Sequence, residues 1–257
     1  MRSRLEIFVQ EIKKMETKLK NIIDKAYKIF KYPKPQSIQN VCTECCLNSN
    51  DARLLLTTEL QLIPVELICE YNDGAQALNY DMYEFKYFLP RYLELISQFQ
   101  FTSSVDVSLS LKNLNFNNTE YWTNPEEFKC INEFVNLYFE KCLTTDEFYN
   151  EASLLDIINM LHGSGIDVKP LFQIWLKDLN NFSIIHLEKL ITDNFNYRGR
   201  INTNNFIDSD LNALIENWII TNKKIITAAI ENHIITTSLK EEQLQKLSYL
   251  YDTINYI

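Results

Sequence analysis

The sequence predicts an all-α fold, a multi-helix array that begins with a long N-terminal helix. Three observations predict it: scarce glycine, apolar residues at helical spacing, and clear helix-start signals. Only four of the 257 residues are glycine. Phosphate-binding loops and the turns of many-stranded sheets need glycine where φ is positive or where the backbone approaches a ligand. The composition therefore argues against Rossmann, P-loop, sandwich and barrel folds.

The opening segment carries apolar residues at alternating steps of three and four, which predicts a helix with one continuous apolar seam. The seam consists of Leu5, Phe8, Ile12, Met15, Leu19, Ile22, Ala26 and Ile29. So regular a seam favours packing against other helices. The opposite face is rich in lysine and suits a membrane or an acidic surface. Pro33 and Pro35 end the helix, because proline cannot continue the hydrogen-bond ladder.

Shorter helices follow along the rest of the chain, joined by polar loops that favour antiparallel neighbours. We expect them near 50–58, 64–72, 81–96, 125–143, 145–163, 168–179, 182–194, 209–222, 223–237 and 240–255. Pro90 predicts a kink or a helix pair within 81–96, and Arg91 is expected to pair with an acid such as Glu94. Helix pairs of this size are typical of HEAT or armadillo repeats, although no regular period runs through the sequence.

We expect a single helical domain over 1–257, with two packed halves, 1–100 and 121–257, as the alternative. The Asn-rich segment 100–120 is the best candidate for the boundary between them. Asn124 and Pro125 then form a strong helix start. Gly163 is expected to cap the helix that ends beside it.

The charge is unevenly distributed, since residues 1–35 carry a formal net charge of +6. With −9 overall, the remaining residues carry −15. An acidic body disfavours direct nucleic-acid binding, which requires clustered Lys and Arg, and it attracts basic partners. The alternative is an ordinary solvated surface. Neither a secretion-signal stretch nor a membrane span is found, so we expect a cytoplasmic protein.

Six cysteines are then expected as reduced thiols. Cys42, Cys45 and Cys46 contain a CxxC spacing, half of a zinc site, but no second pair follows at the spacing of a zinc finger. The sequence therefore favours incidental or buried thiols and leaves metal binding at these three residues open.

No catalytic constellation emerges from the remaining residues. His162, His186 and His233 lie on separate expected helices, outside any HExxH pattern, and each fits a surface or capping role. Ser164, between Gly163 and Gly165, lacks the strand that a nucleophile elbow requires. The segment 197–200 holds two arginines, a weak signal for phosphate. We therefore expect neither an enzyme nor a cofactor or metal site.

Paired carboxylates occur at Glu126 and Glu127 and again at Asp146 and Glu147. Both pairs fall in expected first helical turns, where negative charge is stabilised without a catalytic role. These four residues, with Glu151, are our candidates for contacting a partner.

The segment from Tyr83 to Ile96, together with the preceding Cys42, Cys45 and Cys46, resembles an uncharacterised group of bacterial helical proteins that are often encoded beside Rhs-type polymorphic toxins. The resemblance covers mainly residues 36–145. It implies an immunity protein, a cytoplasmic binder that occludes a cognate toxin with a basic surface. The alternatives are a helical-repeat adaptor that holds a peptide in a groove, and an enzyme whose acids bind a divalent metal.

Overall fold

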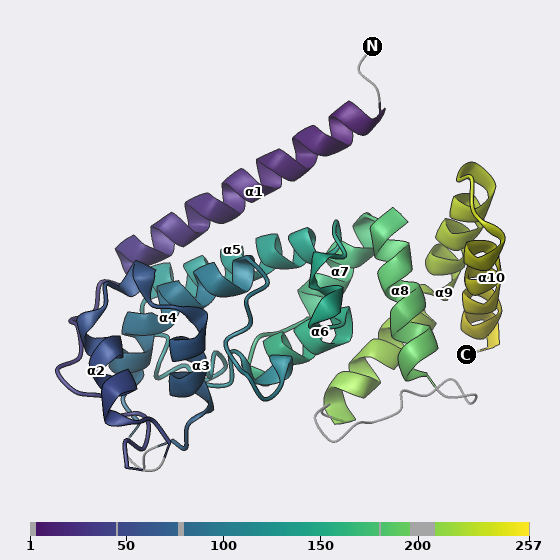
Figure 1. The fold of residues 1–257 in the computed structure, drawn as a ribbon. Helices are drawn as coiled ribbons and strands as arrows, with labels where there is room; N and C mark the ends of the chain where they lie inside the picture. The colour runs from purple at the N-terminus through teal and green to yellow at the C-terminus, as the bar shows by residue number, and fades with distance from the viewer. Residues whose placement is uncertain (1–3, 45, 77–79, 180, 196–208, 257) are drawn as a thin grey trace. The chain divides into compact units, whose positions relative to one another are not determined.

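The computed structural model describes residues 4–256 except 45, 77–79, 180 and 196–208, and this part of the chain is all-α (Figure 1). It contains ten α-helices and no β-strand; the one β-type contact found in it is an isolated antiparallel bridge between Val41 and Gln76. The helices are α1 (Arg4–Ile29), α2 (Ser49–Thr57), α3 (Val65–Asp73), α4 (Met82–Ser97), α5 (Pro125–Cys142), α6 (Leu154–Gly163), α7 (Lys169–Lys177), α8 (Asn181–Asn194), α9 (Ser209–Thr236) and α10 (Glu241–Tyr256). None of the helices among these residues is long and apolar enough to cross a membrane.

The chain forms two compact units, residues 1–141 with 160–166 and residues 142–159 with 167–257. The Asn-rich segment 100–120, expected as a boundary, lies inside the first unit. It is held there by hydrogen bonds to α3: Asn72 Nδ2 donates to Leu109 O at 3.1 Å, and Ser104 N donates to Asp73 Oδ2 at 2.7 Å. The first unit also includes residues 121–141, which we expected in the C-terminal half.

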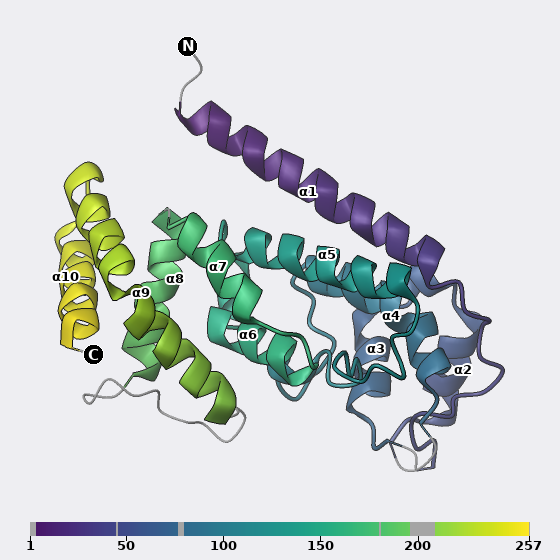
Figure 2. The ribbon, with the colours of Figure 1, turned by 180° about the vertical axis from the view of Figure 1, so that it is seen from behind.

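The first unit is built around α4. Phe85, Phe88, Tyr92 and Ile96 on this helix are fully buried, and the C-terminal end of α1 lies beside it in both views (Figures 1 and 2). Of the two expectations for Pro90, a helix pair or a kink within one helix, the structure excludes the pair, because α4 continues through Pro90 as one element. Burial on nearly every side of α4 supplies the packing energy that offsets the backbone hydrogen bond lost at proline.

The expected start of α5 is confirmed, since Asn124 Oδ1 accepts a hydrogen bond from Glu126 N at 3.0 Å. The expected helix over 145–163 is wrong in its first part. The 3₁₀ turn η3 (Glu147–Asn150) comes first, and α6 begins only at Leu154. A capping box explains the later start: Ser153 N donates to Asp156 Oδ2 at 2.7 Å, and Asp156 N donates to Ser153 Oγ at 3.1 Å.

The second unit packs aromatic rings of α7 against α9 and pairs α9 with α10. The Trp218 ring lies 5.2 Å from Phe172 and 5.1 Å from Trp175. The two helices expected at 209–222 and 223–237 are one helix, α9. The polar run 221–224 contains no Gly or Pro and has no buried member, and the buried stripe continues past it from Ile219 to Ile226. A polar face of this kind continues a helix instead of ending it.

The left-handed residue after α6 is Gly165, with φ of 87°. This differs from the expectation that Gly163 caps the helix. Gly163 is the last residue of α6, and a Cβ added there would meet nothing within 4 Å. A Cβ at Gly165 would lie 2.7 Å from Asn117 N. Gly165 therefore allows both the turn and the close approach of the 115–118 segment.

We expect Gly165→Ala to lower the free energy of unfolding by at least about 1–2 kcal/mol, the cost of a left-handed L-residue, with the contact to Asn117 adding to it. Gly163→Ala is the matched control and should change it by less than about 1 kcal/mol. Urea unfolding followed by circular dichroism measures both variants. Equal effects of the two substitutions would contradict the assignment of the turn to Gly165.

Candidate protein-interaction site

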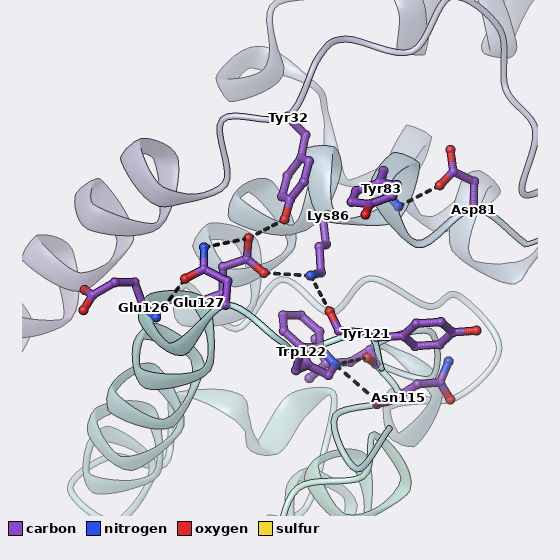
Figure 3. A network of polar contacts seen from close by, with 11 residues as sticks. Tyr32, Asp81, Tyr83, Lys86, Asn115, Tyr121, Trp122, Glu126 and Glu127 are labelled. Atoms are coloured by element: carbon purple, nitrogen blue, oxygen red, sulfur yellow. Dashed lines mark hydrogen bonds and ion pairs between the residues drawn. The ribbon is translucent and has the colours of Figure 1, made fainter. Parts of the chain in front are cut away.

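A buried ion pair joins α4 to α5. Lys86 Nζ lies 2.7 Å from Glu127 Oε2, and the two side chains are 5% and 2% exposed (Figure 3). Removing both charges from water is costly, so such a pair is stable only where further hydrogen bonds satisfy the remaining donors and acceptors.

The surrounding residues supply these partners. Lys86 Nζ donates to the carbonyl of Tyr121 at 2.5 Å and lies 4.5 Å from the centre of the Trp122 ring. Tyr32, which follows α1, donates its hydroxyl to Glu127 Oε1. Asn124 Nδ2 donates to the same oxygen at 3.4 Å. Segments near residues 32, 86 and 121–127 are therefore fixed to one another (Figure 3).

An exposed rim lies beside this buried network. Tyr83 is 65% exposed, and its ring lies 5.5 Å from the half-buried Tyr32 ring. Glu126 is exposed and points away from the Glu127 carboxylate in Figure 3. We call Tyr32, Tyr83 and Glu126 the tyrosine rim. Because Tyr32 is held by the ion pair, the rim presents aromatic surface that loses little conformational freedom when it binds.

The predicted contact residues divide between exposed and buried positions. Glu126 is exposed in the first unit, and Asp146, Glu147 and Glu151 are exposed in and beside η3 of the second. Glu127 is the correction, since it is a buried partner of Lys86 and cannot contact another protein from the surface. Lys86 itself was missed, and its only sequence signal was a single lysine within the aromatic run 85–88.

Two further clusters in the first unit use ionisable groups to hold segments together. The Glu84 carboxylate accepts hydrogen bonds from Gln39 N at 2.6 Å, Asn40 N at 3.1 Å and the Tyr71 hydroxyl at 2.9 Å. Burial raises the pKa of Glu84, and these three donors oppose the shift. They tie the segment after α1 to α4.

The expected pairing of Arg91 is confirmed, with Nη1 lying 2.7 Å from Glu94 Oε2. Arg91 Nε also donates to Ile63 O at 2.8 Å, and the Tyr27 hydroxyl donates to Glu94 at 2.6 Å. The pair of Arg91 and Glu94 therefore links α4 to the segment before α3 through Arg91 and to α1 through Glu94.

The cysteines do not form a recognisable metal centre within the described residues, where no three His, Cys, Asp or Glu side chains are arranged to hold an ion. Cys42 and Cys46 are half-buried, and Cys45 lies outside the described residues. Burial raises the pKa of the Cys69 and Cys130 thiols to about 11, which keeps both protonated at neutral pH.

The surface position expected as one role of the histidines is wrong for His186 and His233, which are 1% and 8% exposed. His233 does lie in the last turn of α9. His186 Nδ1 shares a hydrogen bond with the Tyr149 hydroxyl, and its ring stacks on Phe148. Burial is the main reason that the pKa of His186 is lowered to about 4, so the ring is neutral at pH 7. The arginine segment 197–200 lies outside the described residues.

No family model, curated protein or solved structure matches this chain.

Lys86→Met should lower the free energy of unfolding by about 3–5 kcal/mol, because it leaves the Glu127 carboxylate buried without its cation. Adding Glu127→Gln should restore a large part of that loss, since an uncharged amide still accepts from Tyr32. The matched control is Lys25→Met, which breaks a pair with Glu133 whose side chains are 35% and 41% exposed and should cost less than about 1 kcal/mol. Chemical denaturation measures these variants and the single Glu127→Gln variant, and additive effects of the two single substitutions would contradict the coupling.

Acid should destabilise the second unit through His186. Its folded pKa of about 4 lies below the ordinary value of 6.5, so the unfolded chain binds the proton more tightly. The contribution is complete above about pH 6.5 and is lost as the pH falls towards 4, by about 3 kcal/mol. Urea unfolding at several pH values, followed by tryptophan fluorescence, should show a steeper acid loss for the wild type than for His186→Gln. Parallel curves would refute this role.

Proposed function

We propose that this chain is an immunity protein, which binds a cognate bacterial toxin with a basic surface and neutralises it by occlusion. The observation that carries the proposal is the acidity of the exposed surface. From residue 36 onward, exposed carboxylates far outnumber exposed Lys and Arg side chains in the described part of the chain. Most of the excess negative charge in the sequence therefore lies on solvent-exposed side chains.

Such a surface is complementary in charge to a toxin that acts on a polyanion, because the substrate channel of that toxin is basic. A basic substrate channel is attracted to an acidic protein over long range, and this attraction raises the association rate. Occlusion then needs a firm contact as well as attraction. The tyrosine rim supplies an anchor of the kind that is enriched at interfaces, and it is held in place before binding.

Two exposed acidic regions are our candidates for this contact, and we treat each by itself. Glu126 is the acidic member of the tyrosine rim in the first unit and lies on the first turn of α5. Asp146, Glu147 and Glu151 surround η3 in the second unit, where Thr145 Oγ1 accepts a hydrogen bond from Glu147 N at 3.2 Å. Because η3 is short and solvent-exposed on its acidic side, its carboxylates can approach a partner closely.

Co-expression with the product of the adjacent open reading frame tests the proposal. We expect wild-type protein to restore growth of cells that produce the toxin and to form a complex with it. The triple variant Asp146→Lys, Glu147→Lys, Glu151→Lys should slow association at least about tenfold at low salt. The same number of reversals on α10, at Glu241, Glu242 and Asp252, provides the matched control and should change the rate much less.

Rising ionic strength should slow association of the wild type, because exposed charges are screened beyond roughly 10 Å at 0.1 M salt. Growth that is not rescued, together with no detectable complex, would refute the immunity function. A complex that forms at the same rate with both triple variants would leave that function standing and exclude η3 as the contact.

A further inference from the structure

A groove of about 420 Å³ runs between α1 and α5 in the first unit. Its lining residues are Lys18, Asn21, Ile22, Lys25, Glu133, Asn136 and Leu137. Those of α1 span two turns, and those of α5 span one turn on the facing side. The groove is therefore about 10 Å long, the length of two helical turns.

The floor of the groove is apolar, formed by Ile22 and the half-buried Leu137. Its walls are charged. Lys25 Nζ lies 3.1 Å from Glu133, and Lys129 approaches the same carboxylate at 3.9 Å. Lys18 is exposed, and no ion pair to it is found among the described side chains. The charge left uncompensated in the groove is therefore positive.

The apolar seam of α1 continues beyond the groove towards the N-terminus. Leu19 is 4% exposed, whereas Met15 and Ile12, one and two turns further on, are only half-buried. Lys13, Lys14 and Glu16 beside them are exposed, so lysine predominates among these flanking charges. The groove thus extends into an apolar stripe that the described part of this chain covers incompletely and that lysines flank.

We propose that this groove binds an amphipathic helix of a partner protein, with acidic residues along the edge that faces α1. An apolar floor with matched charge at its rim is the arrangement by which proteins bind such helices. The positive rim selects an acidic helix. A flat anionic bilayer fits less well, because it cannot enter between two helices and would meet Glu133 on the opposite wall.

This site is independent of the proposed immunity function. The surface proposed to contact a toxin is acidic and lies outside this groove, whereas the groove is basic and takes a ligand of opposite charge. The two proposals can therefore fail separately.

Two synthetic 18-residue peptides provide the probe, used with the full chain. Both carry leucine at the first and fourth positions of each heptad. One has glutamate at the flanking positions, and the other has lysine there. We expect the glutamate peptide to bind in fluorescence anisotropy with a Kd on the order of 10–100 μM, and the lysine peptide to bind at least about tenfold more weakly.

Lys18→Glu should weaken the glutamate peptide about tenfold, while Lys28→Glu, an exposed α1 residue outside the groove lining, should change binding less than about twofold. Circular dichroism confirms that both variants fold. The proposal is overturned if the glutamate peptide does not bind, if the two peptides bind equally, or if the two variants behave alike. It is also overturned if phosphatidylserine vesicles bind the protein and the glutamate peptide does not.

Discussion

The buried pair of Lys86 and Glu127 is the interaction on which the organisation of the first unit depends. Its members come from α4 and α5, 41 residues apart in the chain, and Tyr32 adds the segment that follows α1. Removing a carboxylate and an ammonium group from water is costly unless every donor and acceptor has a partner. The pair therefore fixes the segment after α1, the start of α5 and the tyrosine rim relative to one another.

The chain uses ionisable residues in two physically different ways. The buried Glu84 and Glu127 and the partly buried Arg91 hold distant segments together through hydrogen bonds. Most other acids face solvent, where their summed field acts over about a Debye length. Only this second group contributes to a long-range attraction for a basic partner. Net charge alone does not make the distinction, because a buried, paired carboxylate adds little to the external potential.

Charge of the opposite sign is concentrated on α1. Its exposed lysines flank a partly covered apolar stripe, and the groove beside α5 extends that stripe into the first unit. A polypeptide with a basic apolar groove and an acidic remainder can engage two ligands of opposite charge without competition. The proposed toxin contact and the proposed helix-binding groove would then serve separate partners, or separate segments of one partner.

The sequence by itself determined the helical class, the apolar seam of α1, the cap at Asn124 and the pairing of Arg91 with Glu94. Each depends on composition or on residues within one or two helical turns, so local spacing contains the information. Only the tertiary structure decided that α4 continues through Pro90, that α9 is unbroken and that Glu127 and His186 are buried. Burial depends on which distant segments meet, and a carboxylate in a first helical turn looks the same in sequence whether water or Lys86 faces it.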